Sequence, residues 1–413
     1  MPLSTASIRP IRSAQTFNCK TFTVIWWRWK SIFIKGDVFL EFIYENAVEI
    51  VKEQPGMIAM WIIGAFLIFL AIKFDMEPTL LLPMGFGAIL VNLPVAGAPE
   101  VIETLYKATI ENELLPLLLF IGIGAMIDFG PLLSNPKLML FGASAQFGIF
   151  MTLFLAALLG DLGLFGEGFL ITDAASIAII GAADGPTSIF VAGQFGTKYI
   201  GAIIVAAYSY MALVPIVQPP VIKLLTTKKE RLIRMEYSPK GVSRKTRIFF
   251  PIIVTIVVGL IAPECVSLIG FLMFGNLIRE CGRLDSLSET AQKVLANLVT
   301  LLLGIVVAFT MKASDFLRWD TLIVIGLGLV AFIFDTAGGV LFAKFLNLFT
   351  KKKVNPMIGA SGISAFPMSA RVVHKMGLKE DPQNFLLMHS IGVNVSGQVA
   401  SVIAGGIILS ILG

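Results

Sequence analysis

The stretch Ile-Gly-Ala-Ala-Asp-Gly-Pro-Thr-Ser-Ile-Phe, residues 180–190, places one carboxylate, Asp184, inside the apolar segment 169–195. A charge at membrane depth costs several kcal/mol unless it faces a cavity, a partner or an ion. Gly185 and Pro186 follow it directly and interrupt the helical hydrogen bonds, which frees backbone carbonyls that can bind a cation. A role in helix packing is the alternative, but the stretch has the features of an ion site within a membrane.

The composition indicates a membrane protein, because 56% of the residues are hydrophobic, 14% are charged and the mean hydropathy is +0.85. Apolar runs long enough to cross about 30 Å of hydrocarbon occur at 57–73, 138–160, 198–218, 247–263, 321–349 and 385–412. Shorter or interrupted apolar segments lie at 79–97, 113–127, 169–195, 266–279, 297–311 and 356–377. We therefore expect an all-α polytopic membrane protein.

Several classes of function are disfavoured by what the sequence lacks. The three cysteines, Cys19, Cys265 and Cys281, have no metal-ligand spacing, and two histidines are too few for a zinc centre. No phosphate-binding loop or dinucleotide fingerprint occurs in a strand-to-helix context. We expect no redox metal, no use of ATP and no nucleic-acid partner.

The chain has the pattern of an internal repeat. Residues 81–90 resemble 269–278, with Met84 aligned to Leu272 and Gly87 aligned to Gly275. The Ile-Gly-Ala of 180–182 likewise parallels that of 358–360, inside a second interrupted segment. Matching interrupted segments in two halves are the strongest sequence pointer to a transporter's binding site.

The repeat divides the chain into four parts. We expect a first membrane repeat over 38–222, a basic cytoplasmic linker over 223–246 and a second membrane repeat over 247–413. Residues 1–37 are basic and have no long apolar core. This extension is either a segment at the membrane surface or an artefact of start-site assignment.

The charges of the loops predict that the halves are inverted. The loop after 138–160 contains Asp161 and Glu167, whereas the loop after 321–349 is Lys351-Lys352-Lys353. Basic loops remain in the cytoplasm, so these two loops are expected on opposite sides. Nine Lys and Arg residues between Lys223 and Arg247 place that connection in the cytoplasm too.

This topology requires a segment that turns back. Between the outer loop at 161 and the linker the chain must cross an odd number of times, yet it has two apolar segments there. The Asp184 segment is therefore expected to be re-entrant, since irregular backbone is tolerated where it lines a cavity. The fold expected is an inverted repeat with two broken or re-entrant hairpins meeting at the membrane midplane, with Asp184 on one tip and Asn355, Gly359, Ser361 and Ser364 on the other.

Hard oxygen ligands suit sodium, and the two interrupted segments supply them. Besides Asp184, the candidates are hydroxyls and amides, namely Thr187, Ser188, Ser361, Ser364, Asn355 and Asn394. The alternative is that small hydroxylated residues only let helices pack closely. Their concentration around a carboxylate in matching segments favours an ion site.

Three further polar residues lie in apolar surroundings. Arg371 either binds a carboxylate-bearing substrate through its bidentate guanidinium or extends to the membrane surface. Tyr210, in the middle of a crossing, is expected to donate to Asp184 or to relay a proton. Asp335 is a second carboxylate in a long apolar segment.

These motifs resemble one family. They are Gly-Ala-Ala-Asp-Gly-Pro-Thr (181–187), Ala-Tyr-Ser-Tyr-Met-Ala-Leu-Val-Pro (207–215), Gly-Asn-Leu-Ile-Arg-Glu-Cys-Gly (275–282), Asn-Pro-Met-Ile-Gly (355–359), Ser-Ala-Phe-Pro-Met-Ser-Ala-Arg (364–371) and Gln-Asn-Phe-Leu-Leu-Met-His (383–389). Over about 38–413 the chain resembles the β subunit of the sodium-pumping biotin-dependent decarboxylases, which act on oxaloacetate, methylmalonyl-CoA or glutaconyl-CoA.

The resemblance implies that this subunit decarboxylates carboxybiotin and exports Na⁺. By the same resemblance, Arg371, Tyr210 and Asp184 are expected to be catalytic, and Arg371 and Ser364 to bind the carboxybiotin. The expected Na⁺ ligands are Asp184, Asn394, Ser364, Asn355 and Gly359. The family often has proline before the asparagine of Gly-Pro-Asn-Val-Ala-Gly, whereas residues 392–397 here read Gly-Val-Asn-Val-Ser-Gly.

The resemblance also implies partners. They are a carboxyltransferase α subunit, a small membrane γ/δ subunit and a biotin carrier protein, in a complex that contains several copies of this chain. Biotin is expected on the carrier, because the chain has no Ala-Met-Lys-Met attachment sequence. A multi-pass protein of a bacterial or archaeal inner membrane is expected. The alternatives are a sodium-coupled secondary transporter, a sodium/proton antiporter or a membrane anchor.

Overall fold

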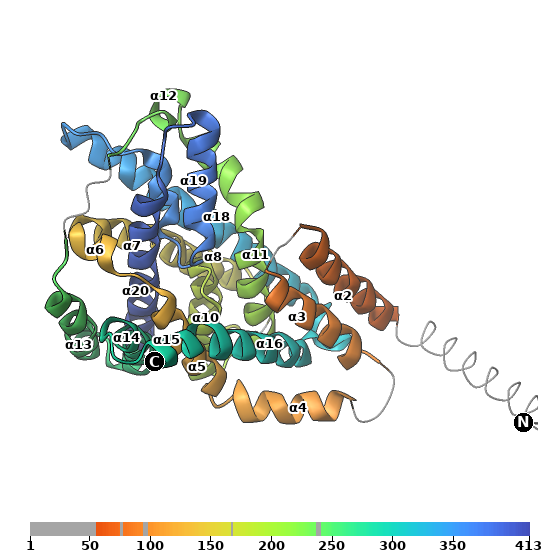
Figure 1. Cartoon of the computed structure of the whole chain (residues 1–413). Helices are drawn as coiled ribbons and strands as arrows, with labels where there is room; N and C mark the ends of the chain where they lie inside the picture. Colours follow the sequence, from red (N-terminus) through yellow and green to blue (C-terminus); the bar gives the residue numbers. More distant parts are fainter. Residues whose placement is uncertain (1–54, 75–76, 94–97, 167, 237–240) are drawn as a thin grey trace, which may run out of the picture. The chain divides into compact units, whose positions relative to one another are not determined.

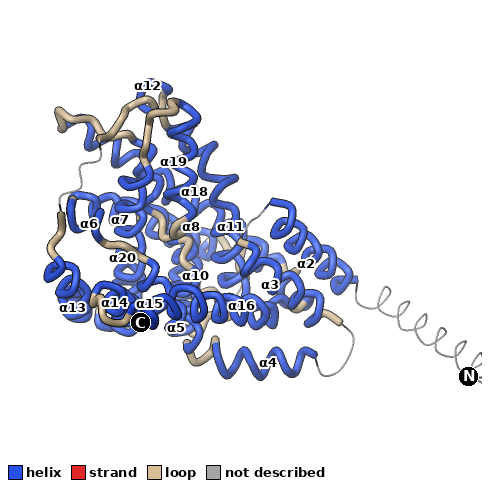
Figure 2. Tube along the Cα trace, viewed as in Figure 1, coloured by secondary structure: helices blue, strands red, loops and turns tan. Residues whose placement is uncertain are grey.

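The computed structural model describes residues 55–74, 77–93, 98–166, 168–236 and 241–413, in which every regular element is a helix (Figures 1 and 2). The expected extension, 1–37, lies outside these residues. The first half contains α2 (Pro55–Phe74), α3 (Pro78–Val91), α4 (Ala98–Thr109), α5 (Leu114–Met126), α6 (Gly130–Ser134), η1 (Pro136–Leu138), α7 (Met139–Ala145), α8 (Phe147–Asp161), α9 (Ile171–Ala178), η2 (Ile179–Ala182), α10 (Gly185–Phe195) and α11 (Ile200–Leu225).

The short helix α12 (Lys228–Arg231) lies in the linker. The second half contains α13 (Arg244–Ile261), η3 (Pro263–Cys265), α14 (Val266–Glu280), α15 (Asp285–Glu289), the π-helical turn η4 (Thr290–Leu295), α16 (Ala296–Val307), η5 (Ala308–Met311), α17 (Ala313–Phe316), α18 (Trp319–Phe349), η6 (Pro356–Gly362), α19 (Met368–Glu380) and α20 (Leu387–Leu412). Figure 1 shows α12 and α19 at one end of the bundle and α14 and α16 at the other.

Six described helical stretches are long and apolar enough to cross a membrane, which makes this a multi-pass membrane protein. They are Pro55–Phe74, Pro136–Asp161, Ile200–Leu225, Asp285–Met311, Trp319–Phe349 and Leu387–Leu412, and the bent pair Pro99–Thr109 and Leu114–Met126 forms a further candidate. Five of the six expected crossings are among them.

The expected crossing 247–263 is not among these stretches. Residues 244–261 do form α13, but its first turn contains Arg244, Lys245 and Arg247, which shortens the uncharged part. The segment 297–311, expected to be short, is instead the end of the long stretch Asp285–Met311.

Helices from the two halves pack against each other in matching pairs. Helix α14 packs on α5, and α16 packs on α3. Glycines permit both contacts: a Cβ atom on Gly124 of α5 would lie 1.9 Å from the carbonyl oxygen of Leu272, and one on Gly304 of α16 would lie 2.9 Å from that of Leu80. Helix α11 similarly packs on α18, and α20 packs on α7. The two broken segments lie among these contacts.

Candidate ion site between two broken segments

The first broken segment consists of α9, η2 and α10. The helical path ends at Ala183, which has the left-handed φ of +50°, and a new helix begins with Gly185 and Pro186. Proline suits the first turn of a helix because it has no N–H to satisfy. Asp173, at the start of α9, accepts a hydrogen bond of 2.5 Å from Thr197, just after α10. The two ends of the segment therefore meet, and the break lies at the turn between them.

The second broken segment consists of η6, an irregular stretch over 363–367, and α19. Its two ends also meet. The side-chain amides of Asn355, before η6, and Asn384, after α19, both donate to the carbonyl oxygen of Arg231, at 2.9 and 3.0 Å. The stretch 363–367 lies between the two helical arms.

The breaks of the two segments touch. The backbone N–H of Ser364 donates to the carbonyl oxygen of Ala182 at 3.0 Å. Helix α20 supports this contact, because the Ser364 hydroxyl donates to the carbonyl of Gly397 at 3.0 Å and the Asn394 amide donates to that of Ile363 at 2.6 Å. Ser364 and Asn394, both predicted from the sequence, therefore lie together near residue 184.

Asp184 is 3% exposed and directs one carboxylate oxygen, Oδ2, to three donors. Thr187 donates at 2.7 Å, Gln398 of α20 at 2.9 Å and Ser401 of α20 at 3.2 Å. These donors are neutral, and no lysine or arginine in the described part of the chain forms an ion pair with Asp184. A buried carboxylate without a cationic side chain requires another source of positive charge or a proton.

Unused oxygen atoms lie on α20 and α11, which pack against the two broken segments, and on η6 of the second segment. Asn394 Oδ1, the Ser361 hydroxyl and the Tyr208 hydroxyl are buried, and none has a hydrogen-bond partner among the described residues. Tyr208 packs directly on Gly185, where a Cβ atom would lie 2.3 Å from its ring. Oxygen atoms that the protein itself leaves unsatisfied are available to a bound cation.

Tyr210 was expected to donate a hydrogen bond to Asp184, but it does not do so in this structure. Its hydroxyl donates instead to the carbonyl oxygen of Ile325 on α18. Residues two apart in a helix point about 200° from each other, so Tyr208 faces the broken segment while Tyr210 faces α18. Of these two tyrosines, Tyr208 lies beside Asp184.

Asn355 and Gly359 lie on the η6 arm, and no described hydrogen bond joins either to Asp184. The Asn355 amide is fully engaged, since it donates to Arg231 and Ile233 and accepts from the N–H of Met357. Gly359 packs backbone to backbone, because a Cβ atom there would lie 2.0 Å from the carbonyl oxygen of Gly339. In this structure both residues shape the arm.

Arg371 lines a cavity of about 710 Å³ between α11 and α19. With Lys375 and Lys379 it forms a basic stripe along one face of α19, since the three are four residues apart. Lys223 and two prolines of α11 form the opposite wall, with Met368, Val372 and Met376 among the apolar lining. The Arg371 side chain has no ion pair or hydrogen bond with any described residue, so its guanidinium is available to a ligand.

Asp335 is a second buried carboxylate, 1% exposed, on α18. Its oxygens have no well-formed hydrogen bond in the described part of the chain. A Cβ atom on Gly181 of η2 would lie 3.0 Å from Oδ2, and one on Gly148 would lie 2.3 Å from Oδ1. The N–H groups of Gly148 and Ile149, in the first turn of α8, interact with this carboxylate. A helix N-terminus favours a carboxylate.

Gln398, Ser401 and the position of Tyr208 beside Asp184 were not predicted from the sequence. A signal for the first two was present, because Asn394, Gln398 and Ser401 follow the spacing i, i+4, i+7 and so share one face of an apolar helix.

The fold and the site define a class: a polytopic helical membrane protein in which two broken segments touch around a buried carboxylate. A family model described as "Na+-transporting oxaloacetate decarboxylase beta subunit" matches residues 56–412. The chain belongs to this family, and is a membrane subunit of a decarboxylase complex coupled to Na⁺ transport.

Curated relatives support the assignment. The chain is 48% identical over 373 residues to the methylmalonyl-CoA decarboxylase subunit beta of Veillonella parvula, covering 89% of this chain and 98% of the relative. It is 46% identical over 383 residues to the glutaconyl-CoA decarboxylase subunit beta of Acidaminococcus fermentans, covering 92% and 96%. It is 43% identical over 412 residues to the oxaloacetate decarboxylase beta chain of Klebsiella pneumoniae, covering 86% and 94%.

Proposed function

We propose that this chain itself decarboxylates a carboxylated biotin presented by a partner subunit, and couples that step to Na⁺ export. The observation that carries the proposal is the position of Asp184. Its carboxylate is buried at the contact between two broken segments, and no cationic side chain of the described residues neutralises it. A sodium ion bound there, with Asn394 and Ser364 nearby, would supply the missing charge.

The Arg371 cavity supports the decarboxylation half of the proposal. An N-carboxylated biotin has an anionic carboxylate on a largely apolar bicyclic ring. The cavity offers a free guanidinium, two lysines on the same helix face and apolar side chains. We assign the carboxylate to Arg371, with Ser364, in the irregular stretch 363–367 that leads into α19, as a further contact. Loss of CO₂ leaves a nitrogen anion on the biotin that takes up a proton. The proton donor expected from the sequence, Tyr210, does not line this cavity.

The two-fold packing pattern supports the proposed inverted repeat. Contacts between α14 and α5 have a counterpart in α16 and α3, and contacts between α11 and α18 have one in α20 and α7. An exchange of equivalent helices between halves is what inverted repeats produce. The ion site would then lie near the membrane midplane, reached in turn from each side.

The remaining parts of the proposal concern partners. The chain would act with a carboxyltransferase α subunit, a small γ/δ membrane subunit and a biotin carrier, in a bacterial or archaeal inner membrane and in more than one copy. The names of these relatives give three different carboxyl donors. In our proposal the donor binds the α subunit, so this chain's sites are common to all three.

The test is Na⁺ uptake into inverted membrane vesicles that contain the complex. The proposal predicts uptake when oxaloacetate, methylmalonyl-CoA or glutaconyl-CoA is added, and loss of uptake when avidin blocks biotin. Na⁺ movement that follows a solute or proton gradient and ignores all three donors would instead indicate a secondary transporter.

A further inference from the structure

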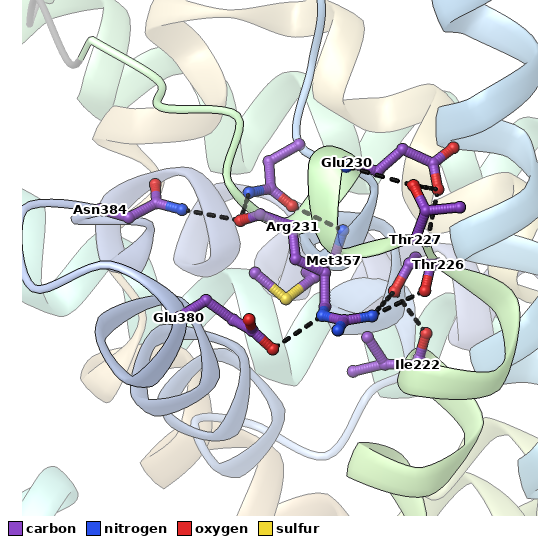
Figure 3. A network of polar contacts seen from close by, with 9 residues as sticks. Ile222, Thr226, Thr227, Glu230, Arg231, Met357, Glu380 and Asn384 are labelled. Carbon is purple, nitrogen blue, oxygen red and sulfur yellow. Dashed lines mark hydrogen bonds and ion pairs between the residues drawn. The ribbon is translucent and has the colours of Figure 1, made fainter.

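The linker residue Arg231 joins the two helices that form the walls of the Arg371 cavity (Figure 3). Its Nη1 donates to the carbonyl oxygen of Thr226, at the end of α11, at 2.6 Å. Its Nε donates to the carboxylate of Glu380, the last residue of α19, at 2.8 Å. One guanidinium therefore links the ends of α11 and α19 at the same end of the cavity, where Glu380 is itself a lining residue.

The backbone of the same residue holds the ends of the second broken segment. As described above, the Arg231 carbonyl accepts from both Asn355 and Asn384, and these two side chains are fully buried. Arg231 thus contacts the chain before η6, at the end of α19 and after α19. The segment between these contacts carries both Ser364 and Arg371.

The linker presents Arg231 in a fixed orientation. Thr227 and Glu230 form a reciprocal capping box at the start of α12, with the Thr227 hydroxyl accepting from the Glu230 N–H. Glu230 also pairs with Lys344 of α18 at 3.2 Å, and Lys344 donates to the carbonyl of Leu225. The linker is therefore attached to α18 as well.

The Arg231–Glu380 ion pair is largely buried. Their side chains are 13% and 17% exposed, so removing one partner would leave the other largely desolvated and unpaired. Exposed ion pairs contribute little by comparison.

We infer that Arg231 is a positioning residue that sets the separation of α11 and α19 and so fixes Arg371 toward the carboxylated biotin. This inference rests on the proposed function of the Arg371 cavity. It also gives Asn355 a role in holding the broken segment, through the carbonyl of Arg231, in place of a direct bond to the ion.

The chain supplies a matched control three residues away. Arg234 also pairs with a residue next to α19, because its Nε donates to Asp381 at 2.5 Å and its Nη1 donates to Gln383 at 2.7 Å. The Arg234 side chain is 57% exposed and has no described bond to α11. The Arg234 guanidinium lowers the pKa of the Asp381 carboxyl, but it does not join the two walls of the cavity.

The experiment compares Arg231→Gln, Arg231→Lys, Glu380→Gln, the double variant Arg231→Gln/Glu380→Gln and Arg234→Gln in the purified complex. Three kinds of measurement are made: the KM and kcat for carboxylated biotin carrier protein, the half-saturating Na⁺ concentration, and amide hydrogen exchange over 368–380 and 296–307. For Arg231→Gln we expect the KM for the carrier to rise on the order of tenfold, the half-saturating Na⁺ concentration to change less than about twofold, and exchange over 368–380 to accelerate. Exchange over 296–307 should not change.

Arg231→Lys should recover part of the loss, because lysine can reach only one of the two helices at a time. Glu380→Gln should resemble Arg231→Gln, and the double variant should be no worse than the stronger single one. Arg234→Gln should stay within about twofold of the parent. Unchanged exchange over 368–380 in Arg231→Gln, or equal effects from Arg234→Gln, would overturn the inference. If the parent complex does not decarboxylate the carrier, the proposed function fails, and the exchange measurement alone decides the role of Arg231.

Discussion

The backbone N–H of Ser364 donates to the carbonyl oxygen of Ala182, 3.0 Å away, and so joins two broken segments that are far apart in the sequence. Each segment has its own ends tied together, one by Asp173 and Thr197 and the other through the carbonyl of Arg231. Asp184 follows this contact by two residues. The ion site that we propose is therefore built where two turns meet, and its geometry depends on how both arms pack.

The first prediction concerns Gly359 and stability. Gly359→Ala would put a methyl group 2.0 Å from the carbonyl of Gly339, so we expect at least about 2 kcal/mol of destabilisation and a lower melting temperature in detergent. Gly326→Ala on α18 is the control, because a Cβ atom there meets nothing within 4 Å. Equal melting temperatures for Gly359→Ala and the parent, together with weaker Na⁺ dependence, would mean that Gly359 serves the ion and not the packing.

The second prediction concerns the donors to Asp184 that the sequence arguments missed. Gln398→Leu removes the amide that donates to Oδ2, and we expect the Na⁺ concentration for half-maximal turnover to rise about five- to tenfold. Ser401→Ala should have a smaller effect, because its bond is longer at 3.2 Å. Ser410→Ala is the control: it is exposed near the end of the same helix, and no described hydrogen bond joins it to Asp184. Na⁺ titration of turnover measures all three, and an unchanged titration curve for Gln398→Leu would contradict the site.

The third prediction separates substrate from ion. Arg371→Ala should raise the KM for the carboxylated carrier by at least about tenfold and leave the half-saturating Na⁺ concentration within about twofold. Arg371→Lys should rescue only partly, because it lacks the bidentate fork. Arg318→Ala, which breaks an ion pair with Asp320 at the start of α18, serves as control. A shift confined to Na⁺ dependence would show that the substrate assignment is wrong.

The fourth prediction concerns topology. The three native cysteines are first replaced. A cysteine introduced at Leu164 should then react with an impermeant thiol reagent that is added to the outside of intact cells. Cysteines at Lys228 and Lys352 should react only after the membrane is opened. Reaction of Leu164→Cys and Lys352→Cys from the same side would remove the inverted arrangement of the two halves.

Much of this arrangement was readable from the sequence, for identifiable reasons. A carboxylate beside glycine and proline in an apolar run indicates a broken helix, and a second Ile-Gly-Ala in another interrupted segment indicated its partner. The contact between Ser364 and Ala182 agrees with that expectation. Short motifs of this kind are local, so they can be recognised in the sequence without knowledge of the tertiary packing.

Which face of each helix points toward the site could not be predicted from the sequence. Helix α11 is apolar around most of its circumference, so periodicity could not say whether Tyr208 or Tyr210 faces the broken segment. The structure places Tyr208 against Gly185 and directs Tyr210 to α18. The bonds of Asn355 were equally hidden, because its partners belong to a linker more than a hundred residues earlier. Such contacts depend on tertiary packing.

Whether Asp184 binds the transported ion can be measured as uptake of radiolabelled Na⁺ by inverted vesicles that contain the Asp184→Asn variant. The amide keeps the shape of the side chain and can still accept hydrogen bonds from Thr187 and Ser401, so we expect the complex to assemble with a melting temperature close to that of the parent. Uptake driven by the carboxyl donor should fall by at least about a hundredfold, because the variant lacks the charge that balances the ion. Donor-driven Na⁺ uptake at the parent rate would contradict the claim that Asp184 binds the transported ion.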